Sequence, residues 1–405
     1  MNLRYTSTSI LFCLISIFRI NTAVAEKTAD PIVVGVVHSS AHPSAELMKG
    51  SFDMAIEAIH TKGGANGKSL KLIYADDGLR ASGSIGYQRG NEEDAIKSLI
   101  DRGAVMMIGG YSSANTIHMA NLAEKFSIPF LVTTAADNQI TQRKLKNVYR
   151  LNVPAEEYAG GLEKLLNKEI KPKTIAIMYE ASRYGTDAAA RMISFCHDNG
   201  IKMAKLIPYQ KDRVNASYLK KRLRRIQQNP PDVVYMVSYL EDAVLLVNTI
   251  RRMDINSWMI GAGGGFADSR FIGLLGNSAN GVLTASLWSP QLPYPGAQDY
   301  YNEYVELYSE APDYHGAEAY SAVFVVTDVL ERAETLNPKG IRKALNDTDL
   351  ETPFGQVRFR SDAKYKRQNS APTVVFQVAN SAFELIWPEN IATAALSNPV
   401  KMPGL

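Results

Sequence analysis

Cysteine, net charge and long apolar runs are all scarce in this sequence. Of its two cysteines, Cys13 lies in the first 25 residues, so Cys196 is alone in the rest of the chain and cannot form an intramolecular disulfide there. The formal net charge is only +3, and Arg4 and Arg19 of the first 25 residues contribute to it. The rest of the chain is therefore close to neutral, which does not favour a nucleic-acid or anionic-lipid partner. No later stretch is apolar enough to span a membrane. The fold must therefore be held together by hydrophobic cores, for which 46% hydrophobic residues suffice.

The first 25 residues have the pattern of a secretory signal peptide. Arg4 precedes the short apolar run SILFCLISIF at 9–18, and the small residues AVA at 23–25 precede Glu26. Arg19 ends the apolar run before it is long enough to cross a bilayer. We therefore expect cleavage after Ala25 and a soluble, exported protein.

Short β-branched segments alternate with amphipathic segments from residue 32 onwards. Such alternation is typical of βαβ units, in which helices cover a parallel sheet. The first series has predicted strands at 32–37, 70–77, 104–110 and 128–134, with helices at 45–64, 90–103 and 114–127. The second series has predicted strands at 173–180, 202–209, 232–238, 257–264 and 280–288, with helices at 185–200, 217–228 and 241–253. The sequence therefore predicts an α/β protein of two lobes, each built on a doubly wound parallel sheet.

The C-terminal part of the chain is too small to form a third domain. Two helices are predicted at 297–310 and 316–334, and strands at 355–359, 373–380 and 383–387. We expect these elements to complete the two lobes, so the chain would cross between lobes several times, first near 150–158, through a multi-strand hinge. The predicted division is a signal peptide at 1–25, lobe 1 at 26–150 and about 285–348, lobe 2 at 151–284 and about 349–390, and a C-terminal tail at 391–405.

Ligands of parallel sheets bind outside the carboxyl ends of the strands. That rule selects the segments that follow the predicted strands, at 38–46, 109–116, 133–138, 180–187, 238–242 and 261–269. Within them, MIGGYSSANT at 107–116 joins a buried strand to a helix. The first N–H groups of a helix lack internal partners and lie at the positive end of its dipole, so this junction favours an anion.

These loops, in this order, resemble the leucine/isoleucine/valine-binding protein family. Its members are exported solute-binding proteins of the type I periplasmic fold and serve ABC importers. The resemblance covers nearly the whole chain after the signal peptide and rests on TKGGANGKSLKLIYADD, GGYSSANT, FSIPFLVTTAADNQIT, RYGTDAA, DVVYMVSYLEDA, WMIGAGGG, TPFGQVRF and FELIWPE. It implies a monomeric periplasmic protein without cofactor or metal, whose partners are a small solute and an ABC permease.

In the first lobe, the resemblance implies a site for the carboxylate of an amino acid. It places the carboxylate-binding serine at Ser113, with Ser112 and Tyr111 beside it in the same loop. Thr134 and Ala136 fall on the two positions of the next loop that contact the ligand. A hydroxyl bonded to a charged carboxylate contributes about 1.5–3 kcal/mol. Simple helix capping is the alternative role for the two serines.

Aromatic residues are expected on the facing side of the site. Tyr184 and Tyr239 fall on tyrosines that cover the ligand from the second lobe in the resembling family, with core packing as the alternative. His42, in the first loop, is expected to line the cleft and contact the ligand. His38 and His42 lack a third ligand and any zinc-binding spacing, so we expect no metal there.

The loop after the strand WMIGAG departs from the family. There the family usually carries a carboxylate that pairs with the substrate ammonium, but this sequence has Gly263. A buried ammonium without a counter-charge is costly. Either Asp137, Glu241 or Asp242 supplies the charge, or the ligand is not an α-amino acid.

Catalytic and nucleotide-binding motifs are incomplete. GYSSA lacks the last glycine of a hydrolase elbow, and His118 lies five residues after Ser113, so the two point differently on one helix. GAGGGFAD has Phe266 where a dinucleotide fingerprint needs glycine or alanine.

The sequence therefore predicts a binding protein rather than an enzyme. It would capture a small carboxylate-bearing or amide solute, like a branched-chain amino acid, for ABC-type import. The alternatives are a periplasmic receptor that signals to a partner protein, and a binder of a non-amino acid such as an aromatic or keto acid.

Overall fold

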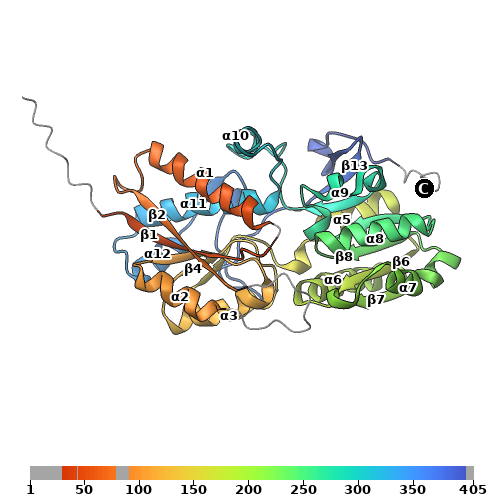
Figure 1. The fold of residues 1–405 in the computed structure, drawn as a ribbon, viewed down its shortest axis with the longest axis horizontal. Coiled ribbons are helices and arrows are strands. Elements are labelled where there is room, and N and C mark those ends of the chain that lie inside the picture. Colours follow the sequence, from red (N-terminus) through yellow and green to blue (C-terminus); the bar gives the residue numbers. More distant parts are fainter. Residues whose placement is uncertain (1–29, 43, 79–90, 398–405) are drawn as a thin grey trace, which may run out of the picture.

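Two lobes lie side by side along the long axis of the molecule, and each contains a sheet covered by helices (Figure 1). The computed structural model describes residues 30–397, except Pro43 and residues 79–90. The predicted signal peptide at 1–25 and the last part of the predicted tail lie outside the described residues. The α/β class and the two parallel sheets are as predicted.

The first lobe contains a five-stranded parallel sheet in the order β2–β1–β3–β4–β5. Its strands are β1 (Ile32–His38), β2 (Leu70–Asp76), β3 (Met106–Gly109), β4 (Phe130–Val132) and β5 (Val148–Arg150). One core packs against α1 (Ala45–Thr61) and α11 (Tyr314–Arg332), and another against α2 (Glu92–Asp101) and α3 (Ser113–Lys125) (Figure 1). Met106 and Ile108 enter the first of these cores and Met107 the second, so the strand is buried on both faces and apolar throughout.

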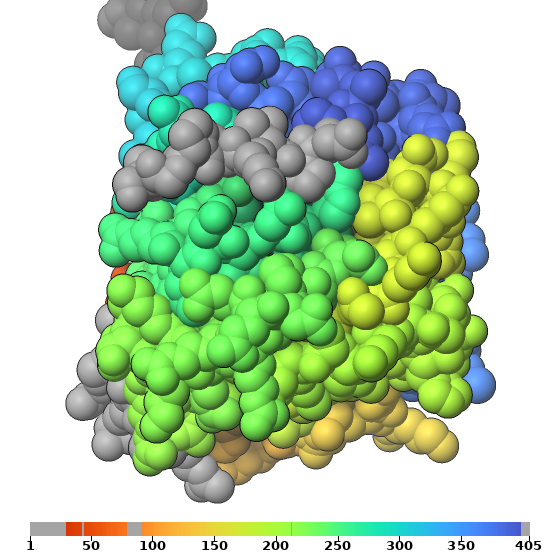
Figure 2. Space-filling view, turned by 90° about the vertical axis from the view of Figure 1, so that its right-hand side faces the viewer, coloured from red at the N-terminus to blue at the C-terminus, as the bar shows by residue number. Residues whose placement is uncertain are grey.

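The second lobe contains a seven-stranded sheet in the order β14–β13–β10–β9–β8–β6–β7. Its strands are β6 (Thr174–Glu180), β7 (Lys202–Tyr209), β8 (Val233–Val237), β9 (Trp258–Gly261), β10 (Leu283–Ser286), β13 (Val374–Ala379) and β14 (Ala382–Trp387). The first five are parallel, and β13 and β14 add an antiparallel edge. Figure 2 shows this end of the molecule, with β13 and β14 (blue) at the top and β7 with its neighbouring helix (green) at the bottom.

Helices cover both faces of the second sheet as well. One face packs against α5 (Gly160–Leu165) and α6 (Arg183–Asp198). The other packs against α7 (Ala216–Gln228), α8 (Leu240–Arg252) and α9 (Phe271–Leu275). The basic run KKRLRR lies on α7, whose buried residues are Leu219, Leu223 and Ile226, so the basic side chains occupy its outer face.

The later elements join the two lobes, as the sequence predicts. They include the helices α10 (Ala297–Tyr308) and α12 (Pro338–Asn346) and the hairpin of β11 (Leu350–Thr352) and β12 (Gly355–Val357). The long helix α11 packs against α1 of the first lobe, whereas β13 and β14 extend the sheet of the second. The chain therefore crosses between lobes more than once. The predicted residue ranges of the two lobes remain a prediction.

A fully buried arginine joins two of these crossings. The backbone of Arg150 donates to the carbonyl of Arg367 at 3.1 Å and accepts from the N–H of Asn369 at 3.0 Å. Its guanidinium donates to Gln368 Oε1 at 2.7 Å, to the carbonyl of Asp137 at 2.7 Å and to Thr141 Oγ1 at 2.9 Å. Burial lowers the pKa of Arg150 to about 10, so the group stays charged at neutral pH. We call this arrangement the Arg150 clamp.

The clamp predicts a large stability effect. Arg150→Met keeps a long side chain but leaves several buried acceptors without a donor, so the free energy of unfolding should fall by at least about 3 kcal/mol. Urea unfolding of the purified variant measures the loss. Arg360→Met is the matched control, because Arg360 is exposed on the same returning segment. Equal losses in both variants would contradict the assigned role of the clamp.

Candidate functional site

The carboxyl ends of the strands in both sheets are followed by the loops that the sequence singles out. A chain of aromatic contacts links these loops across the two lobes. We call it the aromatic belt, and its members in order are His42, Tyr111, His315, Tyr314, Tyr158, Tyr184 and Tyr239. The belt closes on itself, because the rings of Tyr239 and His42 lie 6.1 Å apart, centroid to centroid. It joins first-lobe loops and α11 to the start of α6 and α8 in the second lobe.

The start of α3 forms a compact polar pocket wall in the first lobe. Gly109 has φ +120°, and a Cβ there would lie 2.2 Å from the carbonyl oxygen of Val37, so no larger residue fits this turn. The chain then turns into α3, whose first residue is Ser113 and whose N-cap is Ser112. The N–H of Asp137 donates to Ser113 Oγ at 3.1 Å, which leaves the hydroxyl proton of Ser113 for another acceptor. Ser112 Oγ is buried and has no hydrogen-bond partner among the described residues.

Thr134 and Ala136 lie in the loop that packs against this helix start. The N–H of Thr134 donates to the carbonyl of Gly110 at 3.4 Å, and Ala135 donates to the same carbonyl at 2.9 Å. The carbonyl of Ala136 accepts from the N–H of Ala155 at 2.7 Å. The structure therefore brings the predicted first-lobe residues to one edge, where buried hydroxyls and helix N–H groups could hold an anion.

Tyr111 and His42 stack at the first-lobe side of the belt. Their ring centroids lie 3.6 Å apart, and Nδ1 of His42 accepts from the N–H of Ser44 at 3.1 Å. Burial, together with the charges of His315, Lys211 and Arg270, lowers the pKa of His42 to about 2. The imidazole is therefore neutral, with Nε2–H as its donor. Among the described residues, no group of three or more His, Cys, Asp or Glu side chains is arranged to hold a metal ion.

Tyr184 and Tyr239 form the second-lobe side of the belt. Tyr184 is buried near the start of α6, and its hydroxyl donates to the carbonyl of Ala262 at 3.4 Å. Tyr239 is the half-buried N-cap of α8, and its ring lies 5.7 Å from that of Tyr184. Both predicted tyrosines thus belong to the belt, and both also pack with a hydrophobic core.

Gly263 has a backbone conformation that excludes a side chain. Its φ of +82° and ψ of −145° lie in a region that only glycine adopts readily. A Cβ would also lie 3.3 Å from Cδ2 of Tyr158 and 3.2 Å from the carbonyl oxygen of Ala285. An acid at this position, as in the resembling family, would therefore be strained by the turn and would press on the Tyr158 ring.

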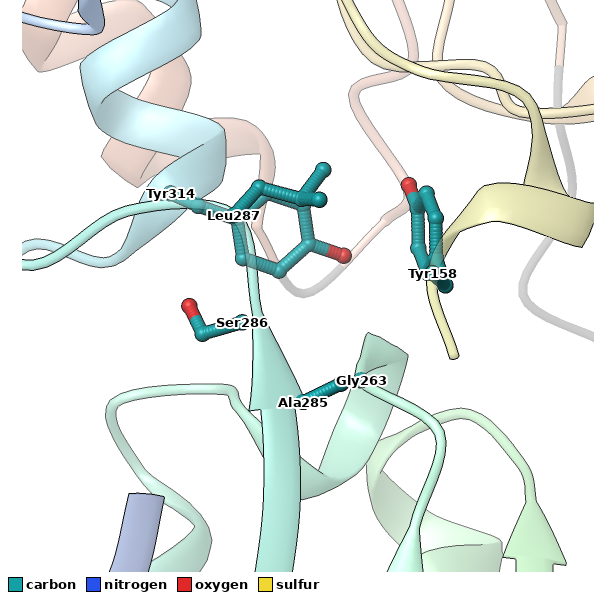
Figure 3. A pocket seen from close by; sticks show the side chains of 6 residues that line it. All are labelled: Tyr158, Gly263, Ala285, Ser286, Leu287 and Tyr314. Atoms are coloured by element: carbon teal, nitrogen blue, oxygen red, sulfur yellow. The ribbon is translucent and has the colours of Figure 1, made fainter. Parts of the chain in front are cut away.

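Sequence reasoning missed the residues that surround Gly263. A narrow pocket is lined by Tyr158, Gly263, Ala285, Ser286, Leu287 and Tyr314, and we call it the interlobe pocket (Figure 3). The rings of Tyr158 and Tyr314 stand on opposite sides of it, with centroids 6.4 Å apart (Figure 3). Both tyrosines lie in segments that the sequence analysis treated as a crossing and a connection, so nothing local marked them.

The three acids that the sequence offered as counter-charges for an ammonium group are either paired with a basic side chain or buried in α8. Asp137 pairs with Arg183 at 2.5 Å, with 2% and 41% of the two side chains exposed. Glu241 is exposed and pairs with Lys211 at 3.6 Å. Asp242 is buried in the first turn of α8.

The Asp137–Arg183 pair bridges the two lobes, and the N–H of Asn138 also donates to Asp187 Oδ2 across the same boundary, at 3.1 Å. We call these two contacts the interlobe latch.

Asp242 belongs to a buried acidic pair in the second lobe. Burial and the neighbouring Asp242 raise the pKa of Glu180 to about 7, and burial raises the pKa of Asp242 to about 6. Glu180 Oε2 and Asp242 Oδ2 have no hydrogen-bond partner among the described residues. The pair lies at the carboxyl end of β6 and the start of α8, next to the belt residue Tyr184.

Comparison with known proteins finds relatives along nearly the whole chain. A family model described as periplasmic binding protein matches residues 31–382. The Leu/Ile/Val-binding protein homolog 7 of Brucella melitensis is 24% identical, and the match covers 95% of this chain and 98% of that protein. The Leu/Ile/Val-binding protein homolog 8 of Brucella abortus is 26% identical, with 85% and 86% covered.

Two solved structures share the fold with this chain. The branched-chain amino acid transporter substrate-binding protein LivJ of Streptococcus pneumoniae, in complex with isoleucine, has a TM-score of 0.75 at 18% identity, over 88% of this chain and 99% of that one. An ABC transporter solute-binding protein of R. palustris, in complex with benzoate, has a TM-score of 0.76 at 15% identity, over 92% and 99%.

The buried acidic pair predicts a falling stability as pH rises. The folded state holds the proton of Glu180 more tightly than the unfolded chain, so the penalty is absent below about pH 4.5 and complete above about pH 7. Glu180→Gln removes that penalty and should recover about 2–3 kcal/mol at pH 8 relative to pH 4. Urea midpoints at both pH values measure it. Glu57→Gln, at an exposed glutamate of α1, serves as control, and parallel pH profiles for wild type and Glu180→Gln would refute the assignment.

Proposed function

We propose that this chain captures a small carboxylate-bearing solute between its lobes for an ABC importer. The chain belongs to the periplasmic binding protein family, and the Leu/Ile/Val-binding protein homologues among its relatives agree with the resemblance found in the sequence. Membership makes it a solute-binding protein rather than an enzyme. The start of α3 carries the proposal, because buried hydroxyls converge there with the first N–H groups of the helix.

A carboxylate is the group shared by the ligands of the two solved relatives. One of these proteins was solved in complex with isoleucine and the other with benzoate. An anion held by Ser113, Ser112 and the first N–H groups of α3 needs no partner charge at Gly263. Thr134 and Ala136 complete this side of the proposed site, with Tyr111 and His42 above it.

The aromatic belt supports closure of the lobes around the solute. Tyr184 and Tyr239 belong to the second lobe, whereas Tyr111 and His42 belong to the first. A solute that touches both sets binds the closed form better than the open form, so it shifts the population toward closure. The closed form is then the one presented to a membrane permease.

We further propose export to the periplasm, with cleavage after Ala25, and a monomer as the working form. No helix within residues 30–78 and 91–397 is long and apolar enough to cross a bilayer. A periplasmic receptor of the same fold is the second candidate function. Neighbouring permease and ATPase genes would favour import, and a neighbouring histidine kinase gene would favour sensing.

Loss of the Ser113 hydroxyl tests the proposed anion site. Ser113→Ala removes one hydrogen bond to a charged group, so affinity for carboxylate solutes should fall at least about tenfold. Calorimetry with amino acids, aromatic acids and their amides measures the change. Ser217→Ala, at an exposed serine in the first turn of α7, should bind as the wild type does. Unchanged affinity of Ser113→Ala for every bound solute would show that the anion lies elsewhere.

The interlobe latch predicts a smaller effect on closure. Arg183→Gln breaks a partly exposed ion pair worth up to about 1 kcal/mol, so the dissociation constant should rise about twofold to fivefold. Small-angle scattering should also show a more open unliganded protein. Arg191→Gln, on the same helix, breaks a pair with Glu163 within the second lobe and should leave affinity unchanged. An equal effect of both variants would mean that the latch does not govern closure.

A further inference from the structure

One buried carboxylate next to the site stands out among the described residues. Glu318 is fully buried in α11, and neither of its carboxylate oxygens has a hydrogen-bond partner within the described part of the chain. The residues on either side of it in the helix, Ala317 and Ala319, carry no polar side chain. An ionised carboxylate buried without a counter-charge is strongly unfavourable, so this position needs either a proton or a cation.

Glu318 lies on α11 close to Tyr314, which lines the interlobe pocket. It follows Tyr314 by one helical turn and therefore shares a face of α11 with it. Tyr314 and Tyr158 line the pocket from opposite sides (Figure 3), and Glu318 acts electrostatically on both tyrosines. The Thr134 hydroxyl, on the proposed carboxylate side of the site, also lies near Glu318.

The cationic groups around Glu318 form hydrogen bonds or ion pairs with other residues. The guanidinium of Arg150 donates to Gln368 Oε1, to Thr141 Oγ1 and to the Asp137 carbonyl within the clamp. His315 lies 3.0 Å from Asp313 Oδ1, so it pairs with a different carboxylate. No protein cation is therefore bonded to Glu318 among the described residues.

The belt beside Glu318 suits a positive charge. Five of its seven members are tyrosines, and tyrosine rings attract cations. His42 is neutral, so it does not repel one. Gly263 carries no acid, and Asp268, farther along the same loop, pairs with Arg270 at 2.6 Å. Glu318, by contrast, has no hydrogen-bond partner among the described residues.

We propose that Glu318 is the counter-charge for a cationic nitrogen of the bound solute, which is therefore a zwitterion such as an amino acid. This inference rests on the proposed function, because it assigns the second charged group of a solute whose carboxylate lies at α3. The carboxylate end would lie near Ser113 and the nitrogen between Tyr158, Tyr314 and Glu318.

The proposal links binding to proton release. Burial raises the pKa of Glu318 well above its usual range, against the opposing influence of Thr134 and Arg150, while Asp313 raises it further. Tyr158 and Tyr314 also face the group and stay neutral, because burial raises the pKa of both. A bound cation favours the ionised form, so Glu318 should lose its proton on binding, and affinity for zwitterions should rise with pH.

The experiment compares zwitterions with their deaminated counterparts. Calorimetry with the proteinogenic amino acids, glycine betaine and the matching keto acids should show that the wild type prefers a zwitterion. Glu318→Gln should weaken zwitterion binding at least about tenfold and leave keto-acid binding unchanged. Glu92→Gln, at a buried glutamate of α2 outside the belt, should change neither.

A second measurement uses the wild type alone. Titrations in buffers of different ionisation enthalpy should show about one proton released per zwitterion and none per keto acid. Absence of that release, equal losses for both solute classes in Glu318→Gln, or wild-type binding of keto acids but no zwitterion would overturn the inference. The proposed function is tested separately, because Ser113→Ala should weaken both solute classes. A wild type that binds no carboxylate at all would overturn both.

Discussion

The buried guanidinium of Arg150 is the interaction on which the site depends most. It fixes the crossing at β5 to the returning segment around Gln368, and it also holds the carbonyl of Asp137. Asp137 in turn donates its N–H to Ser113 and pairs its side chain with Arg183 of the other lobe. One side chain thus connects the hinge, the proposed anion site and the interlobe latch. Since a buried charge bonded to neutral acceptors tolerates little displacement, the hinge and the first-lobe side of the site, including Asp137 of the latch, keep a fixed geometry relative to each other.

The backbone turn at Gly263 and the ring of Tyr158 limit where acidic side chains can lie in the site. The turn at Gly263 places the loop after β9 directly against Tyr158, so the second lobe contributes aromatic surface there instead of charge. Two other acids near the lobe boundary, Asp137 and Asp313, are paired. Glu318 differs from them because neither of its carboxylate oxygens has a hydrogen-bond partner among the described residues. The distribution of charge in the site therefore follows from backbone conformation as much as from residue type.

The strands and most helices could be predicted from the sequence, because strands buried on both faces are apolar runs and the helices show clear periodicity. The sequence analysis missed β5, because VYR at 148–150 is too short to show periodicity and becomes a strand only by pairing with β4. It also missed α12, although Asn337 before Pro338 is a recognisable start signal. The belt residues Tyr158 and Tyr314 could not be found locally, because only the fold brings them together. Glu318 did carry a signal, as the single acid in an apolar stretch of α11.

Two opposing contributions explain why the lobes would close only around a solute. They come from the latch and from the buried polar groups. The latch is partly exposed and contributes at most about 1 kcal/mol, too little to keep the lobes shut by itself. Ser112 Oγ and both oxygens of Glu318 are buried without partners among the described residues, and each unsatisfied polar group costs about 1–3 kcal/mol. A zwitterion that satisfies these groups removes that cost at the moment it gains the aromatic contacts. The same residues that would recognise the solute would thereby disfavour closure in its absence, which is the behaviour a binding protein needs in order to report its loaded state.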